Sequence, residues 1–281
     1  MPVERKVDEM LGGFKKEKTV FRTYQEDNED TTELMLAQDL RYSKIMRDCR
    51  TELEREDLKK VIEKFYSKLK NIFLFYVSKS VSYPAMDMND LDTFCKQSKI
   101  YDRNLNKATL DRTVTQTTLP NTERLIYRHD FIELMIRLGL AKYREQKPTI
   151  TITEAAELVF TREVVGRNEK NTIEARLWRE NYLYTAKVHE ILRRNEKETK
   201  KLFEANLGAR QKYLHFDDVV RIIKKANLNL GDERINRCFI ECLMPKVDSL
   251  KDLKAARQMK YVEFIVMIGR IAHELYSKTK Q

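Results

Sequence analysis

The chain has 281 residues, of which 35% are charged and 42% hydrophobic, with 7 Gly and 5 Pro. An average chain of this length would carry roughly 30 to 35 of these two residues, and sandwiches, barrels and doubly wound sheets depend on them for their turns. The composition therefore predicts an all-α fold, arranged as one large domain or two smaller ones.

The net charge is +10 and is unevenly distributed along the chain. Residues 1–56 carry a net −3, whereas 57–146, 147–215 and 216–281 carry +5, +4 and +4. A basic body of this kind favours an acidic partner such as nucleic acid, an anionic membrane or tubulin. The alternative is a solvated surface of mixed charge.

Cysteine usage and hydropathy indicate a reducing compartment and no membrane span. The four cysteines form no CxxC pair, which disfavours a structural zinc site and favours free thiols: Cys49, Cys95, Cys238 and Cys242. The first 30 residues lack the apolar core of a signal peptide, and the longest apolar run, 72–77, is far too short to cross a bilayer. We therefore expect a cytosolic protein.

The first 30 residues are polar, with a Gly12-Gly13 pair and an acidic run at 26–30, and they predict an extended arm. Hydrophobic residues are scattered along it: Met10, Leu11, Phe14, Val20, Phe21 and Tyr24. We expect the arm to become ordered by wrapping a neighbouring protein. A leading helix is expected from residue 31 to about residue 50.

Helical periodicity and breaking residues predict the elements that follow. A long amphipathic helix is expected at 55–78, and a second long helix at 172–206. A linker is expected around Pro148 and the β-branched string 149–153. Shorter helices are expected at 89–99, 106–116, 128–143, 154–166, 216–226, 232–244 and 260–276.

A short string recurs where four of these helices begin. In each copy an apolar residue is followed four positions later by an acid: Met86 and Asp90, Ile126 and Asp130, Leu214 and Asp218, Met259 and Glu263. The acids lie 40 and 45 residues apart within each half of the chain, and 128 and 133 apart between halves. This regularity indicates a duplicated supersecondary unit.

The repeated string resembles the EF-hand. In that family the apolar residue at loop position 8 pairs with the partner loop, and the acid at position 12 binds calcium. The resemblance assigns position 12 to Asp90, Asp130, Asp218 and Glu263. It implies two tandem EF-hand-like helix-loop-helix pairs, preceded by an extended N-terminal arm. The expected domains are the arm and leading helix at 1–54, the first pair at 55–146, a linker at 147–171 and the second pair at 172–281.

The calcium ligands of the EF-hand are missing from these loops. Counting back from the acids puts Lys79, Leu119, Leu207 and Asp252 at position 1, where an oxygen ligand is needed. Position 6, which requires glycine, holds Pro84, Arg124, Lys212 and Arg257. Asp252 is the one ligand type among the four position-1 residues, so Asp252 and Glu263 form the least unfavourable candidate metal loop. Positions 3 and 5 of that loop, Lys254 and Ala256, supply no side-chain oxygen. We expect no bound metal or other cofactor.

No pattern in the sequence indicates catalysis. Phosphate-binding and dinucleotide-binding glycine motifs are missing, and none of the four histidines belongs to an HExxH motif: His129, His189, His215 and His273. Nothing near Cys95 would activate its thiol. We therefore expect that the protein is not an enzyme.

Basic doublets lie on four expected helices: Lys59-Lys60, Arg193-Arg194, Lys200-Lys201 and Lys224-Lys225. They form either solvated faces or contacts with an acidic partner. The charge forms no continuous stripe and no RNA-binding aromatic motif is present, which disfavours nucleic acid.

The Lys- and Asn-rich helices and the segment 65–76 (FYSKLKNIFLFY) resemble EF-hand-domain proteins of ciliates and related protists. Size and charge layout resemble an inner-junction protein of the ciliary doublet microtubule. The resemblance implies a structural, non-enzymatic protein of the ciliary axoneme that docks on tubulin or neighbouring axonemal proteins, with neither nucleic acid nor membrane as partner. A calcium-responsive regulator or adaptor is the main alternative, and a lipid-binding or nucleic-acid-binding module is a third.

Overall fold

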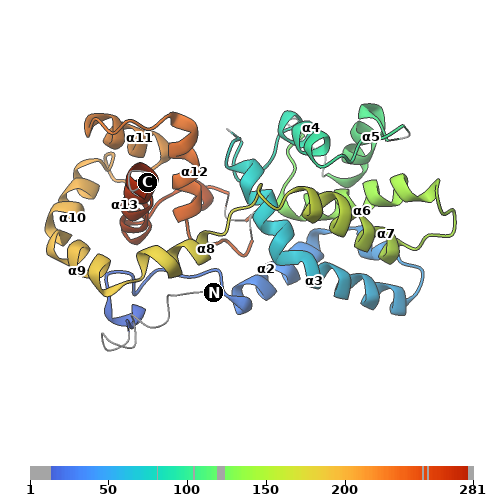
Figure 1. Ribbon diagram of the computed structural model, residues 1–281, viewed down its shortest axis with the longest axis horizontal. Helices are drawn as coiled ribbons and strands as arrows, with labels where there is room; N and C mark the ends of the chain where they lie inside the picture. The colour runs from blue at the N-terminus through green and yellow to red at the C-terminus, as the bar shows by residue number, and fades with distance from the viewer. Residues whose placement is uncertain are drawn as a thin grey trace. The chain divides into compact units, whose positions relative to one another are not determined.

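The computed structural model describes residues 14–80, 82–103, 105–118, 124–248, 250–251 and 253–277 (Figure 1). Every regular element within these residues is a helix, and extended pairing there is limited to two isolated bridges. The all-α prediction is therefore confirmed. None of the helices in the described ranges combines the length and the apolar character needed to cross a membrane.

The chain divides into two compact units. Unit 2 comprises Asn28–Ile173 and Lys246–Leu253, and unit 1 comprises Glu174–Pro245 with the described parts of Met1–Asp27 and Lys254–Gln281. Each unit therefore includes a short segment from the other half of the chain. The first division falls after Asp27 rather than at residue 54, because the leading helix packs on the helices of unit 2.

Unit 2 is built on the long helix α3 (Glu52–Val77), which lies where its periodicity predicts it. Thr51 caps this helix by accepting a hydrogen bond from Glu54 N. In its apolar stripe, Leu58, Ile62 and Leu69 are completely buried. The other helices of the unit are α2 (Glu29–Tyr42), α4 (Met88–Gln97), α5 (Lys107–Thr117), α6 (Arg128–Arg144) and α7 (Ile152–Val159).

The leading helix α2 ends at Tyr42, eight residues before the predicted end. A carboxylate on α6 explains the early stop: Glu133 Oε2 accepts hydrogen bonds from Ser43 Oγ at 2.8 Å and from Lys44 N at 2.6 Å. These bonds hold Ser43 and Lys44 outside the helix, and a 3₁₀ turn, Ile45–Arg47, follows.

The predicted linker 147–171 contains a packed helix. Thr151 and Glu154 form a capping box that starts α7, and the helix continues into a π-helical turn, η3 (Phe160–Val165). α7 contacts both α3 and α6 (Figure 1). The approach to α6 is close, since a Cβ added at Gly139 would lie 2.8 Å from Val159 Cβ. This part of the chain therefore belongs to the core of unit 2 and is not an open connection.

Unit 1 contains the C-terminal helices, with α13 contacting α10 and α12 (Figure 1). The single helix predicted at 172–206 is wrong, because four shorter elements occupy this region: α8 (Ala175–Trp178), the π-helical turn η4 (Arg179–Leu183), α9 (Ala186–Arg194) and α10 (Glu196–Ala205). The predicted helices α11 (Phe216–Lys225), α12 (Asp232–Cys242) and α13 (Tyr261–Tyr276) are present.

The break in the predicted long helix lets both of its ends reach the same partner. Thr185 starts α9 as a new N-cap, accepting a hydrogen bond from Val188 N. Leu183, before the break, packs beside Gly269 of α13, and Phe203, after it, lies 5.6 Å from the Phe264 ring. A straight helix could not place both side chains on α13.

The described part of the predicted arm, residues 14–27, packs within unit 1. Phe21 is completely buried and Tyr24 is 3% exposed, and Tyr24 Oη donates a hydrogen bond to Cys242 O. This packing corrects the prediction of an extended arm for these residues, since Phe21 and Tyr24, two of the side chains expected to contact a neighbour, are buried within the chain. Met10 and Leu11 lie outside the described residues.

Candidate functional site

Two isolated antiparallel bridges join the first residues of the four recurring strings in pairs. Met86 and Ile126 exchange two backbone hydrogen bonds of 2.9 Å, and Leu214 and Met259 exchange bonds of 3.0 and 2.8 Å. All four residues are completely buried. They are the residues that the EF-hand alignment puts at loop position 8.

The four acids at position 12 occupy the third position of a helix and turn back to its start. Each accepts a hydrogen bond from the backbone N–H of the residue three positions earlier. The acids and their donors are Asp90 with Asp87 N at 3.2 Å, Asp130 with Tyr127 N at 3.0 Å, Asp218 with His215 N at 2.9 Å, and Glu263 with Lys260 N at 2.5 Å. The carboxylates thus cap α4, α6, α11 and α13, and their charge favours the positive helix N-termini.

Burial differs strongly among these acids. Glu263 is completely buried, and its second oxygen accepts a hydrogen bond from Met244 N at 2.6 Å. Asp130 is also buried, which raises the pKa of its carboxyl to about 7. Asp218 is partly exposed and pairs with Arg221 on the next turn of α11. The same capping position therefore ranges from the surface to the core.

A histidine lies next to the buried carboxyl of unit 2. His129 Nε2 is 3.3 Å from Asp130 Oδ1, while its Nδ1 is buried without a hydrogen-bond partner. Burial lowers the pKa of His129, so the ring is held neutral. A neutral imidazole beside a carboxyl of raised pKa forms no strong ion pair.

The loops offer few oxygen ligands for a cation. Lys79 and Leu207 at position 1, and Lys254 and Ala256 in the fourth loop, provide no side-chain carboxylate or carbonyl. Leu119 and Asp252 lie outside the described residues. In the fourth loop both oxygens of Glu263 already accept backbone N–H groups. Within the described ranges no group of three or more His, Cys, Asp or Glu side chains is placed to hold a metal ion.

One loop has a left-handed residue at position 6, where a calcium loop needs glycine. Arg124 has φ 49°, and its guanidinium donates a hydrogen bond to Thr115 Oγ1 at 3.0 Å. A side chain costs about 1 to 2 kcal/mol in this backbone region. The turn geometry is thus present at Arg124 although the glycine is not.

A buried arginine in unit 2 was not indicated by any motif. Arg128 makes a two-pronged pair with Asp39, at 2.6 and 2.9 Å, and also donates a hydrogen bond to Val247 O at 3.0 Å. Tyr66 Oη donates to the same carboxylate at 2.6 Å. Arg128 thereby holds the segment Lys246–Leu253 in this unit.

Unit 1 contains a similar centre at Arg179, which pairs with Glu26 at 2.8 Å and donates to Glu241 O at 3.1 Å. Tyr184 donates to the other oxygen of Glu26. Burial alone would raise the pKa of Glu26, but Arg179 outweighs it and lowers that pKa. The pair fixes the N-terminal segment in unit 1. The 153-residue separation of Glu26 and Arg179 gives no local sequence signal.

The cysteines are free and buried. Burial raises the pKa of Cys238 to about 12 and raises that of Cys95 as well. Both thiols are therefore protonated near neutral pH, the form that is a poor nucleophile.

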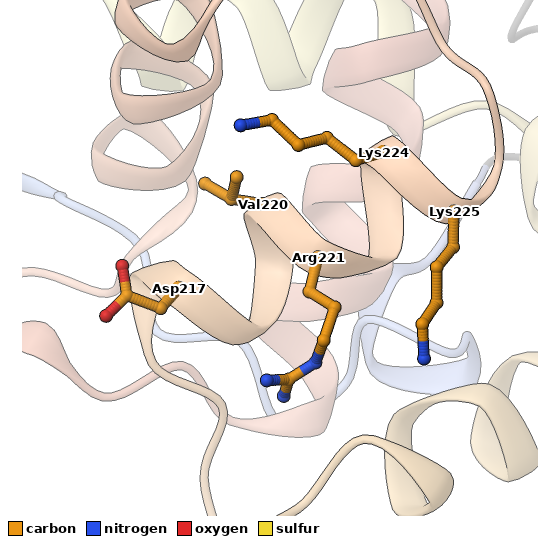
Figure 2. A pocket seen from close by; sticks show the side chains of 5 residues that line it. All are labelled: Asp217, Val220, Arg221, Lys224 and Lys225. Carbon is orange, nitrogen blue, oxygen red and sulfur yellow. The ribbon is translucent and has the colours of Figure 1, made fainter.

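A shallow depression runs along the exposed side of α11 (Figure 2). It is lined by Asp217, Val220, Arg221, Lys224 and Lys225. Two of its three cations are already neutralised, since Arg221 pairs with Asp218 and Lys224 lies 3.2 Å from Asp232. The depression therefore carries little unbalanced charge.

No protein-family model, curated protein or solved structure matches this chain.

Proposed function

We propose that the two loop pairs are EF-hand-like units that retain the pairing of their loops without calcium chemistry. The observation that carries this proposal is the coincidence of the two bridges with the two pairs of position-8 residues. The capping bonds support it, because they give the four acids a structural role that needs no metal.

On this basis the protein is a non-enzymatic structural protein that binds other proteins. The resemblance stated for the sequence gives the location and partner: the ciliary axoneme, where the chain docks on doublet-microtubule tubulin or on neighbouring axonemal proteins. The net charge of +10 supports an acidic partner of this kind.

Co-sedimentation of the full chain with microtubules tests the docking role, with calcium in one arm and a chelator in the other. We expect equal amounts of protein in the microtubule pellet in both arms, and none in the pellet without microtubules. Protein left in the supernatant would contradict docking on tubulin. Binding that requires calcium would favour the alternative of a calcium-responsive regulator.

A tagged copy in a ciliated cell tests the location. The proposal expects the tag along the axoneme after detergent has removed the membrane. A tag confined to the cell body would contradict an axonemal role and leave a general adaptor as the better description.

A further inference from the structure

Three large apolar side chains of unit 1 are exposed on α8, η4 and α13. Leu177 on α8 is 50% exposed, Tyr182 on η4 is 54% exposed, and Tyr276 on α13 is 63% exposed. The centroid of the Tyr182 ring lies 4.6 Å from that of His273, and His273 is one helical turn from Tyr276 on α13. We call Leu177, Tyr182 and Tyr276 the α8–α13 apolar patch.

The π-helical turn η4 brings Leu177, in the last turn of α8, and Tyr182 toward one side of the chain. In an α-helix, residues five apart point about 140° away from each other. A π-helical turn bonds residues five apart, as Tyr184 N does to Arg179 O at 2.8 Å, so side chains with this spacing come closer to the same side. The inner side of the turn is already buried, with Arg179 and Leu183 each 2% exposed. The two apolar side chains are therefore left on the outer side.

The chain that precedes Phe14 begins close to this patch. The Phe14 ring stacks on the Tyr184 ring, with centroids 6.1 Å apart and planes 15° apart, and Tyr184 directly follows η4. The four residues of α8 and the five of η4 together span at most about 14 Å. Thirteen residues span about 20 Å as a helix and up to roughly 45 Å when extended. Residues 1–13, which lie outside the described residues, are thus long enough to reach Leu177 and Tyr182.

The sequence of residues 1–13 predicts a short amphipathic helix. Its apolar residues follow the spacing of one helix side, i, i+4, i+7 and i+8: Val3, Val7, Met10 and Leu11. Pro2 suits the first position of a helix, and Gly12 suits the position just past its end. The Gly12-Gly13 pair also allows the chain to turn back before Phe14. A helix of this length is marginally stable alone in water, so its apolar side needs a surface to pack on.

We propose that residues 1–13 pack as a helix on the α8–α13 apolar patch, with their apolar side against Leu177 and Tyr182. The connection at Phe14 favours this segment over a separate protein, because it holds the segment at a high effective concentration beside the patch. Residues 14–27 already pack within unit 1, so the proposed contact continues an interface of the described chain. The inference does not depend on the proposed docking role.

Limited trypsin digestion of the full chain, read by mass spectrometry, tests this proposal. Trypsin cleaves after Arg5 and Lys6, and a packed helix resists this cleavage until it opens. We expect L177N/Y182N, which leaves the segment itself unchanged, to be cleaved there at least about tenfold faster than the unmodified protein. L34N/L53N is the matched control, since these two leucines of unit 2 are 60% and 70% exposed and should leave the rate unchanged.

A variant of the segment completes the test. M10N/L11N should also be cleaved at least about tenfold faster, and combining it with L177N/Y182N should add no further increase, because both variants remove the same contact. Far-UV circular dichroism checks the fold of each variant. M10N/L11N keeps the test intact if L177N/Y182N fails to fold, since its substitutions lie outside the described core of unit 1.

Cleavage of the unmodified protein as fast as that of M10N/L11N would overturn the proposal. Equal rates in L177N/Y182N and L34N/L53N would overturn it as well, as would a combined variant whose increase is the product of the two separate increases. A rate in the unmodified protein that rises on dilution would show that the segment packs on a second copy of the chain, which also contradicts the proposed contact.

Discussion

The second loop of each unit ends in a buried acid that caps the next helix, but the two carboxylates accept different numbers of backbone hydrogen bonds. Glu263 of unit 1 accepts two backbone N–H groups, those of Lys260 and Met244. Asp130 of unit 2 accepts one, from Tyr127, and its other oxygen lies beside His129. The longer glutamate reaches past its own helix to a second donor. One sequence position thus has a single structural role, filled with two different sets of hydrogen-bond donors.

The helices that begin at these acids, α6 and α13, are packed against different neighbouring elements. In unit 2, α7 and η3 come after the loop pair, and α7 packs on α6 at Gly139. In unit 1, α8 and η4 come before the loop pair, and η4 packs on α13 at Gly269. In each unit the packed element is a short α-helix that continues into a π-helical turn: α7 with η3, and α8 with η4. The packing requirement is the same in both units although the order along the chain is reversed.

Loss of the Glu263 carboxylate should have the largest effect. Glu263→Ala leaves the buried N–H of Met244 and the partly buried N–H of Lys260 without this acceptor, and we expect it to lower the free energy of unfolding by about 3 kcal/mol. Asp218→Ala removes the equivalent, partly exposed cap and should cost about 1 kcal/mol. Urea denaturation of both variants measures the difference. Equal losses would show that the second hydrogen bond of Glu263 contributes nothing.

Asp130 should make unit 2 sensitive to pH. Its folded pKa of about 7 lies above the ordinary value of 3.8. Stability associated with its protonated form is therefore complete below about pH 4 and is lost as pH rises to about 7.

The variant Asp130→Asn isolates this effect, since its side-chain oxygen can still accept from Tyr127 N. We expect the variant to gain about 3 kcal/mol relative to the unmodified protein between pH 4 and pH 7. Thermal unfolding across this range measures the gain. A constant difference between the two proteins would contradict the raised pKa.

Alanine substitutions at Gly139 and Gly269 should distinguish the packing of α7 on α6 from the packing of η4 on α13. At Gly139 a new Cβ meets Val159 Cβ at 2.8 Å and a backbone oxygen at 3.0 Å, neither of which can move freely. We expect Gly139→Ala to cost about 1 to 3 kcal/mol.

At Gly269 the obstacle is the flexible end of Leu183, so Gly269→Ala should cost less than about 1 kcal/mol. Gly231→Ala is the control, because nothing lies within 4 Å of its new Cβ. Thermal unfolding of the three variants gives the order. A larger loss of stability in Gly269→Ala than in Gly139→Ala would show that the contact of η4 with α13 is more rigid than the contact of α7 with α6.

Local patterns were sufficient to predict most helices and the acids at the start of four of them. The apolar stripe of α3 and the strings ending in Asp130 and Glu263 act over a few residues, so periodicity and capping reveal them. Contacts between distant residues were not visible in this way. Glu133 ends α2 from 89 residues away, and Arg179 recruits Glu26 from 153 residues away. Such pairs have no spacing rule, so the early end of α2 and the packing of the N-terminal segment were missed. The break in the predicted long helix coincides with a local N-cap at Thr185, which helical periodicity alone does not reveal.

The central claim is that the loop acids cap helices and do not bind calcium. Isothermal titration of the full chain with calcium tests it most directly, with Glu263→Gln as the comparison. We predict no saturable heat up to about 1 mM calcium, beyond the range of calcium sensors. Saturable binding tighter than about 10 µM, lost in Glu263→Gln, would contradict the claim.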